Sequence, residues 1–420
     1  MYKRIIFGII IYINIICDAI SNEKPMLIKR PFWENLIEES WKQKNVIWLK
    51  GVSRSGKTCL CKTLKEVEYF DCRIPRIRSL LEDDPEGFLD SQKGKRIALD
   101  DIHRLRNPSE ILKLAADYYP TIRIIATGSS TLGASAKFSD TLTGRKREIW
   151  LTPLLLEELN NFCNEDIRHR FLFGGFPSFF CQKQLPEQEF SEWIDAYWAK
   201  DIQELFKVEK RYSFQKFAEL LFVHSGGLFE ATKFAAPSEV SRQTIMTYLG
   251  ILEETFVVHV IRPYSSYRSN EIVMAPKIYG LDTGFICYAK GWRELRKEDT
   301  GLLWEQCVLN EIHGKLQTRA IRYWRSKKGH ELDFVIPTRG DNSISAIECK
   351  FSCLSGNLGE SMITSIGKNI EAFRQNYPHG ENFVVAYDID RSFKRYYHDI
   401  TLNFVSSKEL VERLSQIPIN

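Results

Sequence analysis

The sequence lacks a strong excess of charge, a long apolar run and any internal repeat. Lys and Arg together number 58 against 54 Asp and Glu, which leaves a net charge of +4. This balance is too mild to indicate a nucleic-acid-binding chain, so any basic patch would have to be local. The most apolar stretch, residues 5–17, is too short to span a bilayer. With 44% hydrophobic residues, the composition excludes a multi-span membrane protein and a disordered chain.

The ten cysteines lack the paired spacing of a zinc site. Cys59 and Cys61 stand close together, as do Cys349 and Cys353, but each pair is isolated in the sequence. A chain of 420 residues buries enough apolar surface to fold without disulfides. We therefore expect reduced thiols, as in a cytoplasmic protein.

Three blocks follow an apolar leader at residues 1–25. Short apolar runs alternate with helical stretches over residues 26–165, the pattern of a parallel sheet with crossover helices. Residues 166–275 are mainly helical, and residues 276–420 begin with a helix and continue as strands. The strands expected in the first block are 46–49, 96–99, 122–127 and 148–151, and the last block is expected to hold a helix at 302–316 and strands at 320–325, 331–337 and 343–350.

A phosphate-binding motif follows the first expected strand. The run from Gly51 to Thr58 fits GxxxxGK[ST] and opens a helix, the context that a P-loop requires. Glycines let the backbone N–H groups face phosphate oxygens, while Lys57 can reach the β- and γ-phosphates and the Thr58 hydroxyl can bind Mg²⁺. The motif predicts that ATP and Mg²⁺ are bound, with phosphate contacts from Gly51, Ser53, Ser55, Gly56, Lys57 and Thr58.

An apolar strand that ends in two acidic residues supports this site. We expect Asp100 to bind Mg²⁺ and Asp101 to orient or deprotonate the attacking water. The next strand ends close to Ser129, which could sense the γ-phosphate, unless this segment is a simple turn. Arg145 could reach the nucleotide of a neighbouring subunit as an arginine finger in a homo-oligomer, or belong to a solvated basic turn.

The order of these and later motifs resembles the prokaryotic AAA-type ATPases that carry a C-terminal domain of unknown function. The resemblance rests on these segments, in this order: the P-loop, the Asp-Asp strand, the Thr-Gly-Ser-Ser turn, Leu-Thr-Gly-Arg, Phe-Gly-Gly-Phe-Pro at 173–177, Pro-Lys-Ile-Tyr-Gly-Leu-Asp-Thr-Gly at 276–284 and Glu-Leu-Asp-Phe-Val at 331–335. The resemblance implies the nucleotide-site roles given above. The family usually has Glu where this chain has Asp101, so ATP binding is better supported than turnover.

The middle block has the order of a winged helix-turn-helix. Expected helices at 214–223, 229–234 and 241–252 precede a strand at 256–260, and Ser238 or Ser241 would cap the third helix. Arg242, near the start of that helix, suits contacts with DNA phosphates or base edges. The same pattern also serves as a protein-packing module, and both interpretations stay open.

The last block contains carboxylates in the order of a metal-dependent nuclease site. Glu305 lies on the expected helix, Asp333 on a strand, and Glu348 and Lys350 project from one face of the next strand. Three carboxylates and a lysine around one point can hold a divalent metal and activate water against a phosphodiester. The segment resembles restriction-endonuclease-like nucleases, with Glu305, Asp333 and Glu348 as metal ligands and Lys350 as a catalytic residue. Domains of this fold can also persist as binding scaffolds without cleavage.

These observations predict an α/β chain with a P-loop ATPase domain, a helical winged-helix-like middle and a restriction-endonuclease-like C-terminal domain. The leading hypothesis is an ATPase whose nucleotide state controls a nuclease-like, DNA-interacting module; the alternative is a non-catalytic regulator that acts through protein contacts. An ATP site indicates a cytoplasmic protein without a stable membrane partner. Lys3 and the apolar run up to Cys17 nevertheless resemble a secretory signal. A spurious extension, a real signal or anchor, and a buried element stay open for this leader.

Overall fold

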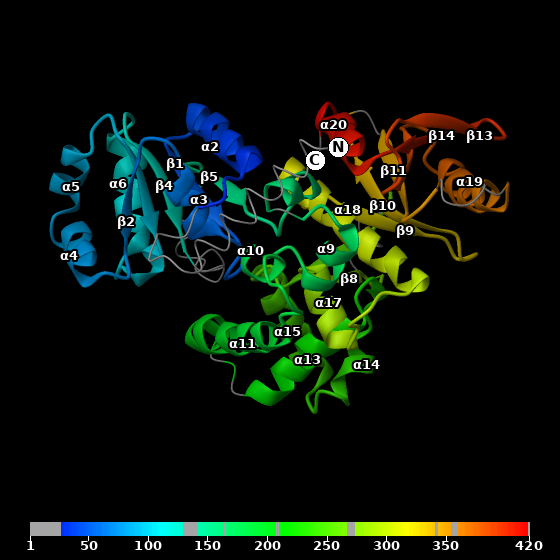
Figure 1. The fold of residues 1–420 in the computed structure, drawn as a ribbon, viewed down its shortest axis with the longest axis horizontal. Coiled ribbons are helices and arrows are strands. Elements are labelled where there is room, and N and C mark those ends of the chain that lie inside the picture. The colour runs from blue at the N-terminus through cyan, green and yellow to red at the C-terminus, as the bar shows by residue number, and fades with distance from the viewer. Residues whose placement is uncertain are drawn as a thin grey trace, which may run out of the picture.

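Three lobes make up the molecule, with the N-terminal, middle and C-terminal parts of the chain at its corners (Figure 1). The computed structural model describes residues 27–128, 142–162, 164–206, 208, 210–266, 274–340, 343–353 and 360–418, apart from the side chains of residues 200, 201, 204 and 205. The leader and Ser129 lie outside the described residues. No helix in the described part of the chain is both long and apolar enough to cross a membrane.

The N-terminal lobe is a five-stranded parallel sheet in the order β2-β3-β4-β1-β5. This confirms the predicted parallel sheet. The strands are β1 (Val46–Lys50), β2 (Val67–Asp71), β3 (Arg96–Asp100), β4 (Arg123–Thr127) and β5 (Lys146–Trp150). The helices are α2 (Pro31–Gln43), α3 (Lys57–Thr63), α4 (Pro75–Asp83), α5 (Pro85–Ser91) and α6 (Pro108–Tyr118), with a short 3₁₀ turn, η1 (Ile102–Arg104).

Four of these strands match the predicted ones, but β2 was not predicted. The central strands are almost fully buried, which gives them the continuous apolar sequences of parallel strands covered on both faces. At the edge of the sheet, β2 is only partly buried and mixes apolar with acidic residues without regular alternation. Its short, mixed sequence therefore carries a weaker strand signal.

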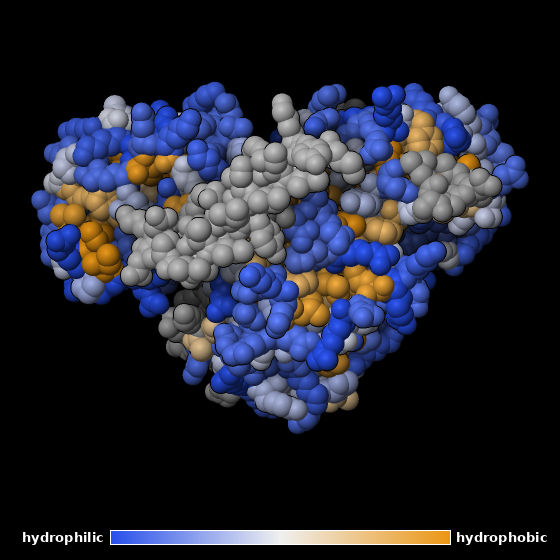
Figure 2. All heavy atoms as spheres, viewed as in Figure 1, coloured by the Kyte–Doolittle hydropathy of each residue, from blue (hydrophilic) through white to orange (hydrophobic). Residues whose placement is uncertain are grey.

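The middle lobe is helical, as predicted, and packs around one aromatic core. Figure 2 shows apolar side chains gathered over this part of the visible face, near α17. Its elements are η2 (Leu156–Phe162), α9 (Ile167–Phe173), α10 (Pro177–Phe180), α11 (Glu187–Tyr197), η3 (Trp198–Ile202), α12 (Gln203–Phe206), α13 (Arg211–Val223), β6 (Gly227–Leu228), α14 (Ala231–Ala235), α15 (Arg242–Glu254), β7 (Val258–Pro263), β8 (Lys277–Gly280) and α17 (Thr283–Lys290).

The C-terminal lobe is a mixed α/β unit whose sheet continues into the middle lobe. The nine strands run β13-β14-β12-β11-β10-β9-β7-β8-β6, so the sheet crosses the predicted boundary at residue 276. The remaining elements are η4 (Lys297–Asp299), α18 (Thr300–Leu316), β9 (Arg322–Arg325), β10 (Glu331–Pro337), β11 (Ile344–Lys350), α19 (Glu360–Arg374), β12 (Asn382–Ala386), β13 (Phe393–Tyr397), β14 (Ile400–Val405) and α20 (Ser407–Ser415).

Candidate functional site

The P-loop lies at the carboxyl edge of the parallel sheet, between β1 and α3. Gly51 and Gly56 have φ angles of 153° and 99°, a region that L side chains rarely adopt. A Cβ atom on Gly51 would lie 2.8 Å from the Leu151 carbonyl oxygen. Both glycines are therefore required by the backbone path, as the motif predicts.

The P-loop brings together the residues expected to contact phosphate. Lys57 Nζ donates to the carbonyl oxygens of Gly51 and Val52, at 2.8 and 3.0 Å, which holds the ammonium group within the loop. The Ser55 hydroxyl is fully buried in the same loop and has no hydrogen-bond partner among the described residues. A buried hydroxyl without a protein partner is consistent with a ligand as its partner.

Thr58 and Asp100 meet at the predicted magnesium site. The strands β1, β4 and β3 are parallel neighbours, so their carboxyl ends share one edge. Thr58, at the start of α3, donates a 2.8 Å hydrogen bond from Oγ1 to Oδ2 of Asp100, the last residue of β3. A hydroxyl and a carboxylate are the oxygen ligands that Mg²⁺ takes at such sites, and the two residues fit the ion.

Two further residues hold Asp100, and neither was among the predicted site residues. Tyr69 on β2 donates a 2.6 Å hydrogen bond to Asp100 Oδ2, and Thr127 at the end of β4 donates to Oδ1. Burial and the Asp100 carboxylate raise the pKa of Tyr69, so this phenol stays a donor. Thr127 was predictable in principle as the polar end of an expected strand, whereas Tyr69 lies on the strand that was not predicted.

Asp101 has a left-handed backbone, with φ at 56° and ψ at 43°. Its amide N–H donates to Thr127 Oγ1 at 3.0 Å, and its carboxylate lies 3.6 Å from Arg73 Nε. Asp and Asn adopt this conformation more readily than longer side chains do. The left-handed backbone is therefore a physical reason for Asp at position 101, where the AAA-type ATPases that the sequence resembles usually have Glu.

Arg145 lies away from the other predicted residues of the nucleotide site. It precedes β5, which runs parallel to β1, so it sits at the amino edge of the sheet, opposite the P-loop. Arg145 Nε donates a 2.7 Å hydrogen bond to Asp117 Oδ1 on α6. From this edge Arg145 cannot serve the nucleotide site of its own chain, and both predictions for it, a contact with a neighbouring subunit and a solvated basic turn, stay open.

A buried ion pair that no sequence motif predicted supports the P-loop. Arg30 and Glu158 are only 3% and 1% exposed, and Arg30 Nε donates to Glu158 Oε1 at 2.7 Å. Arg30 Nη1 also donates to the Ser55 carbonyl oxygen at 3.1 Å, and Glu158 accepts from the Leu155 amide at 2.8 Å. The pair thus ties the P-loop to the chain that leaves β5.

The middle lobe also touches the P-loop directly. Trp193 on α11 donates from Nε1 to the Ser53 carbonyl oxygen at 2.9 Å. Val52 packs in the same buried cluster as Phe176, Phe179 and Trp193. The P-loop backbone is therefore held partly by a neighbouring lobe.

The C-terminal lobe gathers Glu305, Asp333, Glu348 and Lys350 near one another, as the sequence predicted. Glu348 and Lys350 share a face of β11 and form a 3.0 Å ion pair, and Asp333 on the adjacent β10 accepts from the Cys349 amide at 2.8 Å. Burial and the nearby Asp333 raise the pKa of both Glu305 and Glu348 to about 7. The side chains of Glu305 and Glu348 are only 16% and 4% exposed, so water screens their charges little.

Lys277 is the residue of this cluster that sequence reasoning missed. Its ammonium group is 6% exposed and lies 2.5 Å from Glu331 Oε1 and 3.6 Å from Glu305 Oε1. Tyr279, on the same strand β8, donates its hydroxyl to Glu305. Burial opposes the charge on Lys277, but Glu305, Asp333 and Glu331 outweigh it and raise its pKa. Lys277 precedes the helix by more than twenty residues, so no local spacing indicated this contact.

The predicted metal ligands Glu305, Asp333 and Glu348 do not fit a divalent cation in this arrangement. Within the described ranges, no group of three or more His, Cys, Asp or Glu side chains is placed to hold a metal ion. The carboxylates are instead paired with lysines: Lys277 lies close to Glu305 and Glu331, and Lys350 pairs with Glu348. The geometry is that of an internal ion cluster.

Family models cover three successive parts of the chain. Residues 43–160 match an AAA domain, residues 164–296 a domain of unknown function (DUF8612) and residues 300–403 another domain of unknown function (DUF4143). Uncharacterized proteins of Mycobacterium bovis and Mycobacterium tuberculosis are each 24% identical to the chain over 328 residues, 75% of this chain and 73% of theirs.

Among solved structures, a Walker-type ATPase of Pyrococcus abyssi is similar at a TM-score of 0.41 and 16% identity, over 61% of this chain and 94% of that one. The DNA clamp loader delta protein of Bacillus subtilis is similar at a TM-score of 0.23 and 10% identity, over 66% of this chain and 99% of that one. The AAA match agrees with the parallel sheet and the P-loop geometry. The family match and the geometry together support a P-loop ATPase domain of AAA type over residues 43–160.

Proposed function

We propose that this protein binds and hydrolyses ATP, and that its nucleotide state controls a C-terminal, nuclease-like module that interacts with DNA. The observation that carries the proposal is the contact of Thr58 with Asp100 beside Lys57, in a domain of AAA type. These groups lie at the edge where three parallel strands end.

Each residue of the nucleotide site has a role that its position supports. Lys57 and the P-loop amides bind the β- and γ-phosphates, while Thr58 and Asp100 hold Mg²⁺, which neutralises phosphate charge when bound. Asp101 orients the attacking water, and its partner Arg73 keeps the carboxylate in place at 3.6 Å. Arg145 would act on the nucleotide of a second subunit in a homo-oligomer.

The link between the two ends of the protein runs through β5 and α18. Gln317, just after α18, accepts from the Trp150 amide at 2.7 Å and donates to its carbonyl at 3.1 Å. Glu311 on α18 accepts from the Leu156 amide at 2.7 Å. Since α18 also carries Glu305, a shift in the segment behind the P-loop has a direct path to the C-terminal cluster.

The order of elements in the middle lobe supports a winged-helix module. The elements follow in the order α13, β6, α14, α15, β7 and β8, and β8 pairs with both β6 and β7. Ser241 caps α15 by accepting from the Thr244 amide at 3.1 Å, and Arg242 and Gln243 are exposed at its start. An exposed helix start with a cation and an amide is suited to DNA contact.

The C-terminal lobe has the arrangement that a restriction-endonuclease-like module needs. Helix α18 precedes three antiparallel strands, β9 to β11, and α19 then leads to β12, which runs parallel to β11. Asp333 and Glu348 lie on neighbouring strands of this unit. The arrangement supports the fold, and the alternative of a regulator without cleavage is favoured by the lysines among the carboxylates.

Hydrolysis of radiolabelled ATP with and without duplex DNA tests the proposal. We expect the wild type to hydrolyse ATP and DNA to raise its rate several-fold, because the lobes are linked. Arg242→Ala should lose this stimulation but keep basal hydrolysis, whereas Arg293→Ala, which alters another exposed arginine, should behave as wild type. Hydrolysis that DNA leaves unchanged, together with no DNA binding, would favour the protein-contact alternative.

A further inference from the structure

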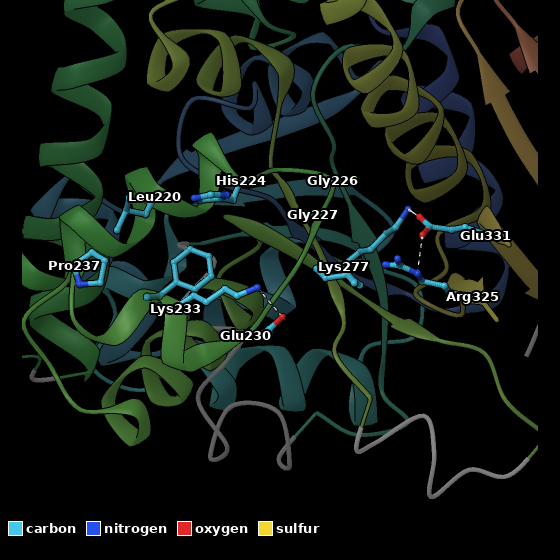
Figure 3. A pocket seen from close by; sticks show the side chains of 12 residues that line it. Leu220, His224, Gly226, Gly227, Glu230, Lys233, Pro237, Lys277, Arg325 and Glu331 are labelled. Atoms are coloured by element: carbon cyan, nitrogen blue, oxygen red, sulfur yellow. Dashed lines mark hydrogen bonds and ion pairs between the residues drawn. The ribbon is translucent and has the colours of Figure 1, made fainter. Parts of the chain in front are cut away.

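A cavity of about 510 Å³ lies between helices of the middle lobe and the strands that carry Lys277, Arg325 and Glu331. Figure 3 shows its lining, with His224 and Lys233 on the side of the helices and Lys277, Arg325 and Glu331 on the side of the strands. Lys277 reaches from the cavity wall toward Glu331, which also faces Arg325. Lys277 thus stands where the cavity meets the carboxylates.

Lys277 places its positive charge among the carboxylates of the cluster. Its stem starts on β8, and its Nζ lies within 3.6 Å of carboxylates from α18 and from β10. Only 6% of the side chain is exposed, so water does not screen these contacts strongly. A buried charge in such a place is stable only when it is paired, and Glu331 and Glu305 supply the partners.

We infer that Lys277 occupies the cation position of the C-terminal carboxylate cluster, so that the resting protein binds no divalent metal there. The inference rests on the proposal that this cluster is the functional site of the C-terminal module. It deepens that proposal by assigning the side-chain ammonium group of Lys277, in place of a metal ion, to the site. Metal-dependent cleavage by the resting chain is then not expected, and the module acts by binding.

A divalent cation would have to displace this ammonium group from Glu305 and Glu331. The two positive charges would otherwise share the same oxygens, and like charges at this distance repel strongly in a poorly solvated site. Lys350 does not create the same conflict, because its nitrogen pairs with Glu348 and, among the described residues, lies within 4 Å of neither Glu305 nor Glu331. Removing the charge of Lys277 should therefore open the cluster to a metal.

Binding of Mn²⁺ alone to the full chain without nucleotide, followed by electron paramagnetic resonance, tests this inference. The wild type should show no Mn²⁺ binding that depends on Asp333. Lys277→Met should gain one such site with at least tenfold tighter binding, and adding Asp333→Asn should abolish it. Lys315→Met is the matched control, because Lys315 also pairs with glutamates but lies outside the cluster.

If Lys277→Met fails to fold, Lys277→Gln serves as a second variant. It removes the charge but keeps a hydrogen-bond donor for Glu331. Wild-type binding of Mn²⁺ that is lost with Asp333→Asn would overturn the inference, as would the absence of tighter binding in a folded Lys277 variant. The measurement needs neither DNA nor ATP. A failure of DNA stimulation would therefore leave the metal result unaffected, and the two failures can be told apart.

Discussion

Asp100 and Asp101 are adjacent in sequence but have separate environments. Asp100 is fully buried and accepts hydrogen bonds from Thr58, Tyr69 and Thr127. Asp101 is 29% exposed and turned toward Arg73 by its left-handed backbone. The first is thus held in one orientation by three hydroxyl groups, and the second is accessible to water. This division supports the different roles that the sequence predicted for the two carboxylates.

Asp101→Asn should lower the rate of ATP hydrolysis by about 100-fold, because an amide cannot accept the proton of the attacking water. The affinity for ATP should change less than about threefold, since this carboxylate is not expected to touch the phosphates. Single-turnover hydrolysis and equilibrium binding measure the two effects separately. Asp90→Asn, at an exposed position on α5, is the control. An unchanged rate in Asp101→Asn would show that this residue has no part in hydrolysis.

Among the elements, regular strands were easier to predict than the contacts between them. The apolar runs that became β1, β3 and β4 were visible because a parallel sheet buries both faces of its central strands. The P-loop was visible because its backbone demands glycine at fixed positions. The pairing of Arg30 with Glu158 was not, because it joins residues 128 positions apart and neither belongs to a motif.

Arg30→Ala should destabilise the protein by about 3 kcal/mol, because it leaves Glu158 buried without its cation. It also removes the hydrogen bond to the Ser55 carbonyl oxygen, so the affinity for ATP should fall. Urea unfolding measures the stability. Lys42→Ala is the control, because it removes one partner of an exposed ion pair on α2, the helix that follows Arg30. It should change the stability by less than about 0.5 kcal/mol. Equal effects of the two substitutions would contradict the assigned importance of the buried pair.

On the scale of the whole molecule, the lobes share a sheet and a helix. The sheet continues from the middle lobe into the C-terminal one, and α18 bonds to the chain that leaves β5. The sequence predicted three blocks, but local patterns do not report which blocks share strands. The C-terminal carboxylates were found by their order, whereas Lys277 enters the cluster only through the pairing of distant elements.

Glu311 makes the contact of α18 with the chain that leaves β5 sensitive to pH. Its burial raises its pKa from the ordinary 4.5 to about 7, against the effects of Lys315 and the Leu156 amide. The folded state therefore binds this proton more tightly than the unfolded state does. Its contribution to stability is complete below pH 4.5 and is lost as the pH rises to about 7.

The stability of wild type relative to Glu311→Gln should consequently fall by about 2 kcal/mol between pH 4.5 and 7.5. Urea unfolding of both proteins at several pH values measures this difference. Burial lowers the pKa of His313 to about 4, which has the opposite effect on stability, but His313 is present in both proteins and its effect cancels in the difference. Glu157→Gln, at a more exposed partner of Lys315, should give a flat difference. A flat difference for Glu311→Gln as well would contradict the assigned pKa.

The most direct test of the account is the binding of a fluorescent ATP analogue with Mg²⁺ to the full chain and to Lys57→Ala. We predict saturable binding to one site per wild-type chain and binding at least about 100-fold weaker in the variant, because Lys57 supplies the charge within the P-loop that faces the β- and γ-phosphates. Equal affinities in a folded Lys57→Ala protein would contradict the assignment of the nucleotide site and the function proposed from it.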